Sequence, residues 1–124
     1  MDPLKAGATA FGGFRVAYGL GLFAVPEKTA KNWLGPDIER GPTQVGARAL
    51  GFRDAIVSAG VVGAVATGAP VRPWLAACAL GDLGDIAATL KVADELPQGA
   101  GWKTALVAGS FAAMGIALAA AFDP

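Results

Sequence analysis

Residues 102–122 read WKTALVAGSFAAMGIALAAAF, and after Lys103 no charged side chain occurs before Asp123. A helix needs about 20 residues to cross a hydrocarbon core about 30 Å thick, so this segment is long enough to span a membrane. A helix on the surface of a soluble bundle would need a polar face. Thr104 and Ser110 are the only polar side chains after Lys103 in this segment. The pattern therefore predicts a transmembrane helix.

Three more apolar segments of similar length precede this one, at residues 7–25, 45–67 and 71–92. The first ends at Pro26, and the second ends at the turn-forming residues 68–70. The later connections are short, which favours antiparallel neighbours. We therefore expect an all-α fold, a four-helix transmembrane bundle with up-down-up-down topology, in which residues 1–124 form a single integral membrane domain.

The connection between the first two segments is longer, and it contains signals for a short helix. Pro26 can open a helix and Gly35 can end one. Ala30, Trp33 and Leu34 share one helical face, with charged residues elsewhere. This pattern predicts a short interfacial helix lying at the membrane surface between spans 1 and 2.

Lysine and arginine are distributed unevenly between the two expected sides of the membrane. Only Lys5 and Arg72 belong to the side that holds both termini. The other side carries Lys28, Lys31, Arg40, Lys91 and Lys103. Because cytoplasmic loops carry an excess of positive residues, both termini should lie outside. The expected location is the bacterial inner (cytoplasmic) membrane, with several passes.

The composition excludes several classes of function. The formal net charge is zero, so nothing favours nucleic acid as a partner. The chain has one cysteine, Cys78, and no histidine, which leaves no spacing typical of a zinc or haem site. We expect neither a metal nor a cofactor. The absence of histidine also excludes Ser-His and Cys-His nucleophile pairs.

Five ionisable residues lie inside the expected spans: Arg15, Arg53, Asp54, Asp82 and Asp85. Charges in hydrocarbon are costly, and they usually face a bundle interior where they have a partner or a function. Asp82 and Asp85 are three residues apart and share one helical face. Arg15 is a candidate partner for them, because its planar guanidinium suits a carboxylate. These five residues are the candidate catalytic or binding residues.

Small residues recur at four-residue spacing, which allows close helix packing in lipid. The rows are Gly13, Ala17 and Gly21 in the first span; Ala47, Gly51 and Ala55 in the second; and Ala105, Gly109, Ala113, Ala117 and Ala121 in the fourth.

An arginine in the first span, the sequence Gly-Phe-Arg-Asp at residues 51–54 and Asp82 in the third span resemble an uncharacterised family of small bacterial four-span membrane proteins. This resemblance implies that Arg15, Arg53, Asp54 and Asp82 act together. In length and span number the chain is also similar to small multidrug transporters. Those proteins rely on a membrane carboxylate in the first span, where this chain has Arg15.

Three functions agree with these features. In the first, the charges lock helices together in an accessory or interaction protein. In the second, the same residues form the site of a membrane-embedded acid-base enzyme, an isomerase or cyclase, on a lipophilic substrate. The third is a proton-coupled small transporter. The expected partners are the lipid bilayer and either a lipophilic small molecule or a membrane protein, and the chain could form a homo-oligomer.

Overall fold

The computed structural model describes residues 2–123 and contains six α-helices and two short 3-10 helices, with no strand in this range. Four helices are long: α1 (Pro3–Ala24), α4 (Gly41–Thr67), α5 (Arg72–Lys91) and α6 (Ala100–Ala121). Each coincides with one predicted segment to within four residues, so the all-α prediction is confirmed. Helices α1, α4 and α5 begin with a proline in the first two positions, where its missing N–H costs nothing.

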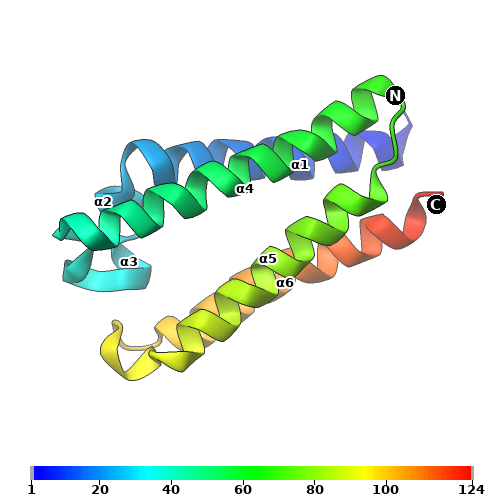
Figure 1. Ribbon diagram of the computed structural model, residues 1–124. Helices are drawn as coiled ribbons and strands as arrows, with labels where there is room; N and C mark the ends of the chain where they lie inside the picture. The colour runs from blue at the N-terminus through cyan, green and yellow to red at the C-terminus, as the bar shows by residue number, and fades with distance from the viewer. Residues whose placement is uncertain (1, 124) are drawn as a thin grey trace.

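The long helices form two antiparallel pairs rather than an evenly packed bundle. Helix α1 packs along α4, and α5 packs along α6. Figure 1 shows the pairs meeting near the end that holds both termini and diverging toward the opposite end. Successive long helices run in opposite directions, which agrees with the predicted up-down-up-down order.

Two glycines allow α1 and α4 to approach closely. A Cβ atom on Gly51 would lie 2.5 Å from the carbonyl oxygen of Gly19, and a Cβ on Gly19 would lie 2.5 Å from the carbonyl oxygen of Gly51. No side chain fits at either position, so the backbones themselves are in contact. This is the close approach that small residues permit between helices.

The predicted rows of small residues are confirmed for only one helix. Ala47, Gly51 and Ala55 are all buried, as expected. In α1 the prediction is wrong, because Gly13 and Ala17 are exposed and the contact with α4 uses Gly12 and Gly19 instead. In α6 it is also wrong: Ala113, Ala117 and Ala121 are exposed, whereas Ala112 and Gly115 are buried.

The connection between α1 and α4 is helical, as predicted, but it is broken. It consists of α2 (Pro26–Thr29), α3 (Lys31–Leu34) and the 3-10 helix η1 (Gly35–Glu39), with a break at Ala30. Gly35 ends α3 with φ of 73°, a conformation that glycine adopts without strain. The Thr29 hydroxyl donates to the carbonyl of Gly21 at 3.0 Å, and Arg48 donates to that of Phe23. These bonds satisfy carbonyls in the last turn of α1.

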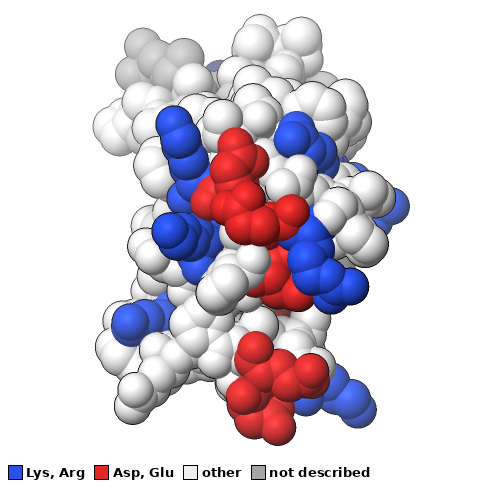
Figure 2. Space-filling view, turned by 90° about the vertical axis from the view of Figure 1, so that its left-hand side faces the viewer, with Lys and Arg blue, Asp and Glu red and all other residues white. Residues whose placement is uncertain are grey.

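Charged side chains gather at the end of the molecule that holds α2, α3, η1 and the 3-10 helix η2 (Ala93–Glu95), which we call the charged end (Figure 2). Asp37 accepts hydrogen bonds from Arg40 at 3.1 Å and from Thr43 at 2.6 Å, joining η1 to the start of α4. The Thr43 bond first, and then the Arg40 bond, lower the pKa of the Asp37 carboxyl.

Large apolar side chains cover much of the outer surface between the two ends. Leu80, Val45, Trp102 and Leu106 are each more than 60% exposed. Among the described residues, helices α4 and α6 are long and apolar enough to cross a membrane. The crossing of all four long helices stays a prediction.

The glycine contact generates a testable difference between two positions on α4. Gly51→Ala should lower the free energy of unfolding by about 1–3 kcal/mol, because its Cβ would overlap the α1 backbone. Gly46→Ala is the matched control, since a Cβ there meets nothing within 4 Å. It should be neutral or slightly stabilising, because alanine favours helix. Thermal unfolding in detergent, followed by circular dichroism, compares the two; equal melting temperatures would contradict the packing.

Candidate functional site

Arg15 on α1 and Asp82 on α5 form a buried ion pair that joins the two helix pairs. The two guanidinium NH2 groups donate to the two carboxylate oxygens of Asp82, at 2.9 and 3.0 Å. Both side chains are more than nine-tenths buried. Such a two-point contact fixes orientation as well as distance. The prediction that Arg15 pairs with a carboxylate of the third span is confirmed.

The remaining faces of the Arg15 guanidinium contact the other two long helices. Its Nε donates to the Ser58 hydroxyl of α4 at 3.3 Å. The rings of Phe11 on α1 and Phe111 on α6 lie 5.3 and 5.7 Å from the guanidinium carbon. A cation over an aromatic face is attracted to it. All four long helices therefore meet at one side chain.

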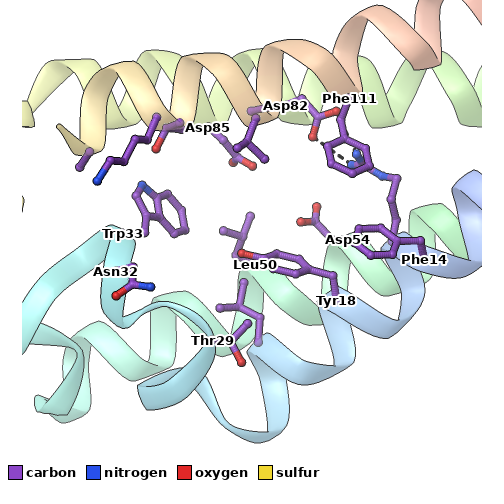
Figure 3. Close-up of a pocket in the computed structure, with 17 residues that line it drawn as sticks. Phe14, Tyr18, Thr29, Asn32, Trp33, Leu50, Asp54, Asp82, Asp85 and Phe111 are labelled. Carbon is purple, nitrogen blue, oxygen red and sulfur yellow. Dashed lines mark hydrogen bonds and ion pairs between the residues drawn. The ribbon is translucent and has the colours of Figure 1, made fainter.

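A cavity of about 350 Å³ lies next to this ion pair, between the two helix pairs (Figure 3). Its walls are largely apolar, and they include Leu22, Leu50, Val107 and Ala108. Small-molecule sites commonly combine such walls with a few polar groups. Among the labelled side chains, Tyr18 and Asp54 reach the cavity from α1 and α4, and Asp82 and Asp85 reach it from α5.

Asp54 and Asp85 differ from Asp82 because neither carboxylate has a partner. Within residues 2–123, no side chain makes a hydrogen bond or an ion pair with either one. Both residues are half-buried, and no fully buried side-chain oxygen in this range lacks a hydrogen bond. Their oxygens are therefore accessible from the cavity. Arg15 is already engaged by Asp82, and it forms no ion pair with either of these two carboxylates.

The cavity is bounded toward the charged end by α3. Trp33 donates from its indole nitrogen to the Thr89 hydroxyl of α5 at 2.9 Å, and that hydroxyl donates to the backbone carbonyl of Asp85 at 2.7 Å. These bonds link α3 to the helix that carries the two aspartates. Asn32 and the exposed Lys103 also line this end of the cavity.

Four of the five predicted site residues are brought together: Arg15, Asp54, Asp82 and Asp85 all line the cavity. Arg53 does not join them, because it is exposed on the outer side of α4. Asp54 faces the cavity, and the side chain of Arg53 lies about 100° away from it around the helix axis, on the exposed side. The prediction that Arg15 lies between two aspartates also differs from the structure, where it binds Asp82 alone.

Sequence reasoning missed three contributors to the site. Ser58 lies one turn after Asp54, and that spacing could have placed it on the same face. The sequence predicts Trp33 in a helix at the membrane surface and gives no sign that it lines a cavity, as it does in the structure. For Phe111 there was no signal, because an aromatic residue in an apolar helix is ordinary.

Comparison with known protein families, with curated proteins and with solved structures found no match to this chain. The resemblance to an uncharacterised four-span family therefore stays a prediction. Within residues 2–123, no group of three or more histidine, cysteine, aspartate or glutamate side chains could hold a metal ion. The function must be argued from the geometry of the cavity.

The ion pair predicts strong energetic coupling. Asp82→Asn or Arg15→Leu alone should each lower the free energy of unfolding by about 3–5 kcal/mol, because each leaves a buried partner uncompensated. The double variant should cost less than the sum of the two. Unfolding by SDS in mixed micelles measures all three variants.

The surface pair Arg40–Asp37 provides the matched control, since its side chains are 68% and 51% exposed. The same comparison of two single variants with the double variant should show little coupling for this pair, because water screens exposed charges. Strictly additive effects for Arg15 and Asp82 would show that the two residues do not depend on each other.

Proposed function

We propose that this protein is an integral membrane protein that binds a lipophilic small molecule in the cavity between its helix pairs. Asp54 and Asp85 hold a cationic or hydrogen-bond-donating group of that molecule. The observation that carries this proposal is the pair of carboxylates without partners in a largely apolar cavity.

The surface supports insertion into a bilayer. In α6 only Ala100, Ala112 and Gly115 are buried, so most of its apolar side chains face outward. Large exposed apolar surfaces are rare on soluble monomers. Helices α1 and α5 have 22 and 20 residues and lie along α4 and α6, so they reach about 30 Å, enough to cross with their neighbours.

Arg53 is compatible with this placement despite its exposure. Side chains on a helix tilt toward its N-terminus, which for α4 lies at the charged end. A long arginine side chain can bury its stem in hydrocarbon while its guanidinium reaches toward the headgroups. Five of the seven lysines and arginines near the helix ends belong to the charged end, which supports a cytoplasmic location for it.

The two unpaired carboxylates argue for a ligand rather than for a purely structural role. A charge cluster that only locks helices together would pair its members, since a buried charge without a partner destabilises the fold. Arg15 and Asp82 form such a lock. Asp54 and Asp85 lie outside it, and a ligand with a donor or a positive charge would compensate them. An accessory role alone leaves these two residues unexplained.

The same arrangement gives acid-base chemistry as a second candidate function. Asp54 and Asp85 come from different helix pairs, and Tyr18 adds a hydroxyl to the same cavity. One carboxylate could take a proton from a bound molecule, while the second carboxyl group or the Tyr18 hydroxyl gives a proton to another atom of the same molecule. The net result is an isomerisation, which needs no oxidant and no cofactor. Binding is common to this function and to a transporter, so it is tested first.

Membrane insertion is tested by extraction and labelling. The protein should stay in the membrane fraction after carbonate washing, because its outer surface is apolar. A cysteine at Asp123, in a Cys78→Ser background, should react with an impermeant maleimide in intact cells. A cysteine at Arg40 should react only after permeabilisation. A soluble monomer without detergent would end the membrane proposal, and the reverse labelling would invert the orientation.

Ligand binding is tested with n-octylamine, a lipophilic amine small enough for the cavity. In a Trp74→Phe, Trp102→Phe background, Trp33 is the only tryptophan. Its fluorescence then reports binding in the cavity that it lines. Asp85→Asn should weaken binding about tenfold to a hundredfold, since a charged hydrogen bond contributes about 1.5–3 kcal/mol. Its melting temperature should change little, because Asp85 has no structural partner.

Two controls accompany this measurement. Asp123→Asn removes an exposed carboxylate at the other end of the chain and should leave binding unchanged. Octanoic acid should bind more weakly than the amine, because its carboxylate would face two others. Equal affinity of wild type and Asp85→Asn for octylamine would remove Asp85 from the site.

A further inference from the structure

We propose that the ligand is a single-chain amphiphile whose polar head lies in the cavity and whose hydrocarbon tail lies in a groove between α1 and α6. This inference rests on the proposed function, and it adds the shape of the ligand and its route from the bilayer. It is carried by a second hollow that adjoins the first.

The groove is lined only by apolar residues. Gly7 and Ala10 of α1 form one side, and Met114, Ala117 and Leu118 of α6 form the other. The small residues leave room between the two helices. Gly7 marks the far end, where an added Cβ would lie 3.8 Å from a methyl group of Leu118. Nothing in this groove could bind a polar group, which suits a hydrocarbon chain.

The cavity and the groove share one wall. Phe14 and Phe111 line both, and their rings stack in parallel with centroids 5.7 Å apart and an interplanar angle of 8°. Phe14 is 59% exposed, so little packs against its outer side. The wall that the two hollows share is the reason to assign the ligand's tail, rather than an unrelated lipid, to the groove.

The cavity is also lined by outward-facing residues along the same line of contact between α1 and α6. Tyr18 of α1 and Val107 of α6 line the cavity and are 47% and 58% exposed. From Tyr18 to Gly7 the path along α1 is eleven residues, or about 16 Å, which suits an alkyl chain of medium length. A molecule dissolved in the bilayer could therefore enter sideways, without passing through water.

The test compares two amines that share a head and differ in tail length, n-octylamine and n-dodecylamine, with Trp33 fluorescence as the readout. Ala10 and Ala117 line the groove but not the cavity, so Ala10→Phe and Ala117→Phe fill the groove from two different helices. Ala59→Phe is the matched control, because Ala59 is exposed on α4 and lines neither hollow. Each ligand is compared across variants in one detergent, so its partitioning into micelles cancels.

Dodecylamine should bind at least tenfold more weakly to both groove variants than to wild type, with no change in Ala59→Phe. Octylamine should bind equally to all four proteins, which also shows that the cavity is intact. Equal dodecylamine affinity in all four, with octylamine still bound, would overturn the groove and leave the cavity standing. Loss of octylamine binding in both groove variants would also overturn the assignment of the tail to the groove, because the head and tail sites would then not be separate. Failure of wild type to bind either amine would remove the proposed function together with this inference.

Discussion

The guanidinium of Arg15 is the point on which the arrangement of the helices depends. It binds Asp82 of α5, donates to Ser58 of α4 and lies against Phe111 of α6, while its own backbone belongs to α1. Removing a charge from water is costly, and only a full set of partners repays that cost. The four helices are therefore held in one register by the need to keep these partners in place. A shift of one turn in any helix would leave the charge without one of them.

The glycine contact and the ion pair together explain why a cavity exists. Gly19 and Gly51 let α1 and α4 touch along their backbones, so this pair is tight. The two pairs contact each other through a buried apolar cluster that includes Phe11, Val61 and Leu75, and through the side chains around Arg15. The pairs diverge toward the charged end. The space left there is bounded by Trp33 and Asn32 of α3 together with Lys103 of α6. Asp54 and Asp85 line this space, and both NH2 groups of Arg15 are used by Asp82.

The distribution of polarity differs from that of a soluble bundle. The Arg15–Asp82 ion pair is buried, most other charged side chains lie near the helix ends, and many large apolar side chains are exposed. In lipid, helices gain little from burying apolar surface, so close packing and polar contacts must hold them together. In the membrane orientation that we propose, the groove between α1 and α6 faces the lipid, where a lipophilic molecule is already dissolved.

The sequence alone determined the four long helices, because prolines and turn residues mark their ends and the apolar runs between them are unambiguous. It also predicted that Arg15 needs a carboxylate of the third span, since a charge in such a segment must be compensated. The sequence could not show which small residues form the contact between helices. Alanine and glycine occur at so many positions that Gly12 and Gly19 could not be told from Gly13 and Ala17.

Tertiary structure decided which carboxylate Arg15 engages, and therefore which ones remain free. It placed Arg53 outside, a consequence of helix rotation that the packing of Ala47, Gly51 and Ala55 against α1 fixes. It also brought Trp33, Phe14 and Phe111 to the cavity from three separate helices. These outcomes depend on distances between segments far apart in the chain, and no local pattern of residues encodes such distances.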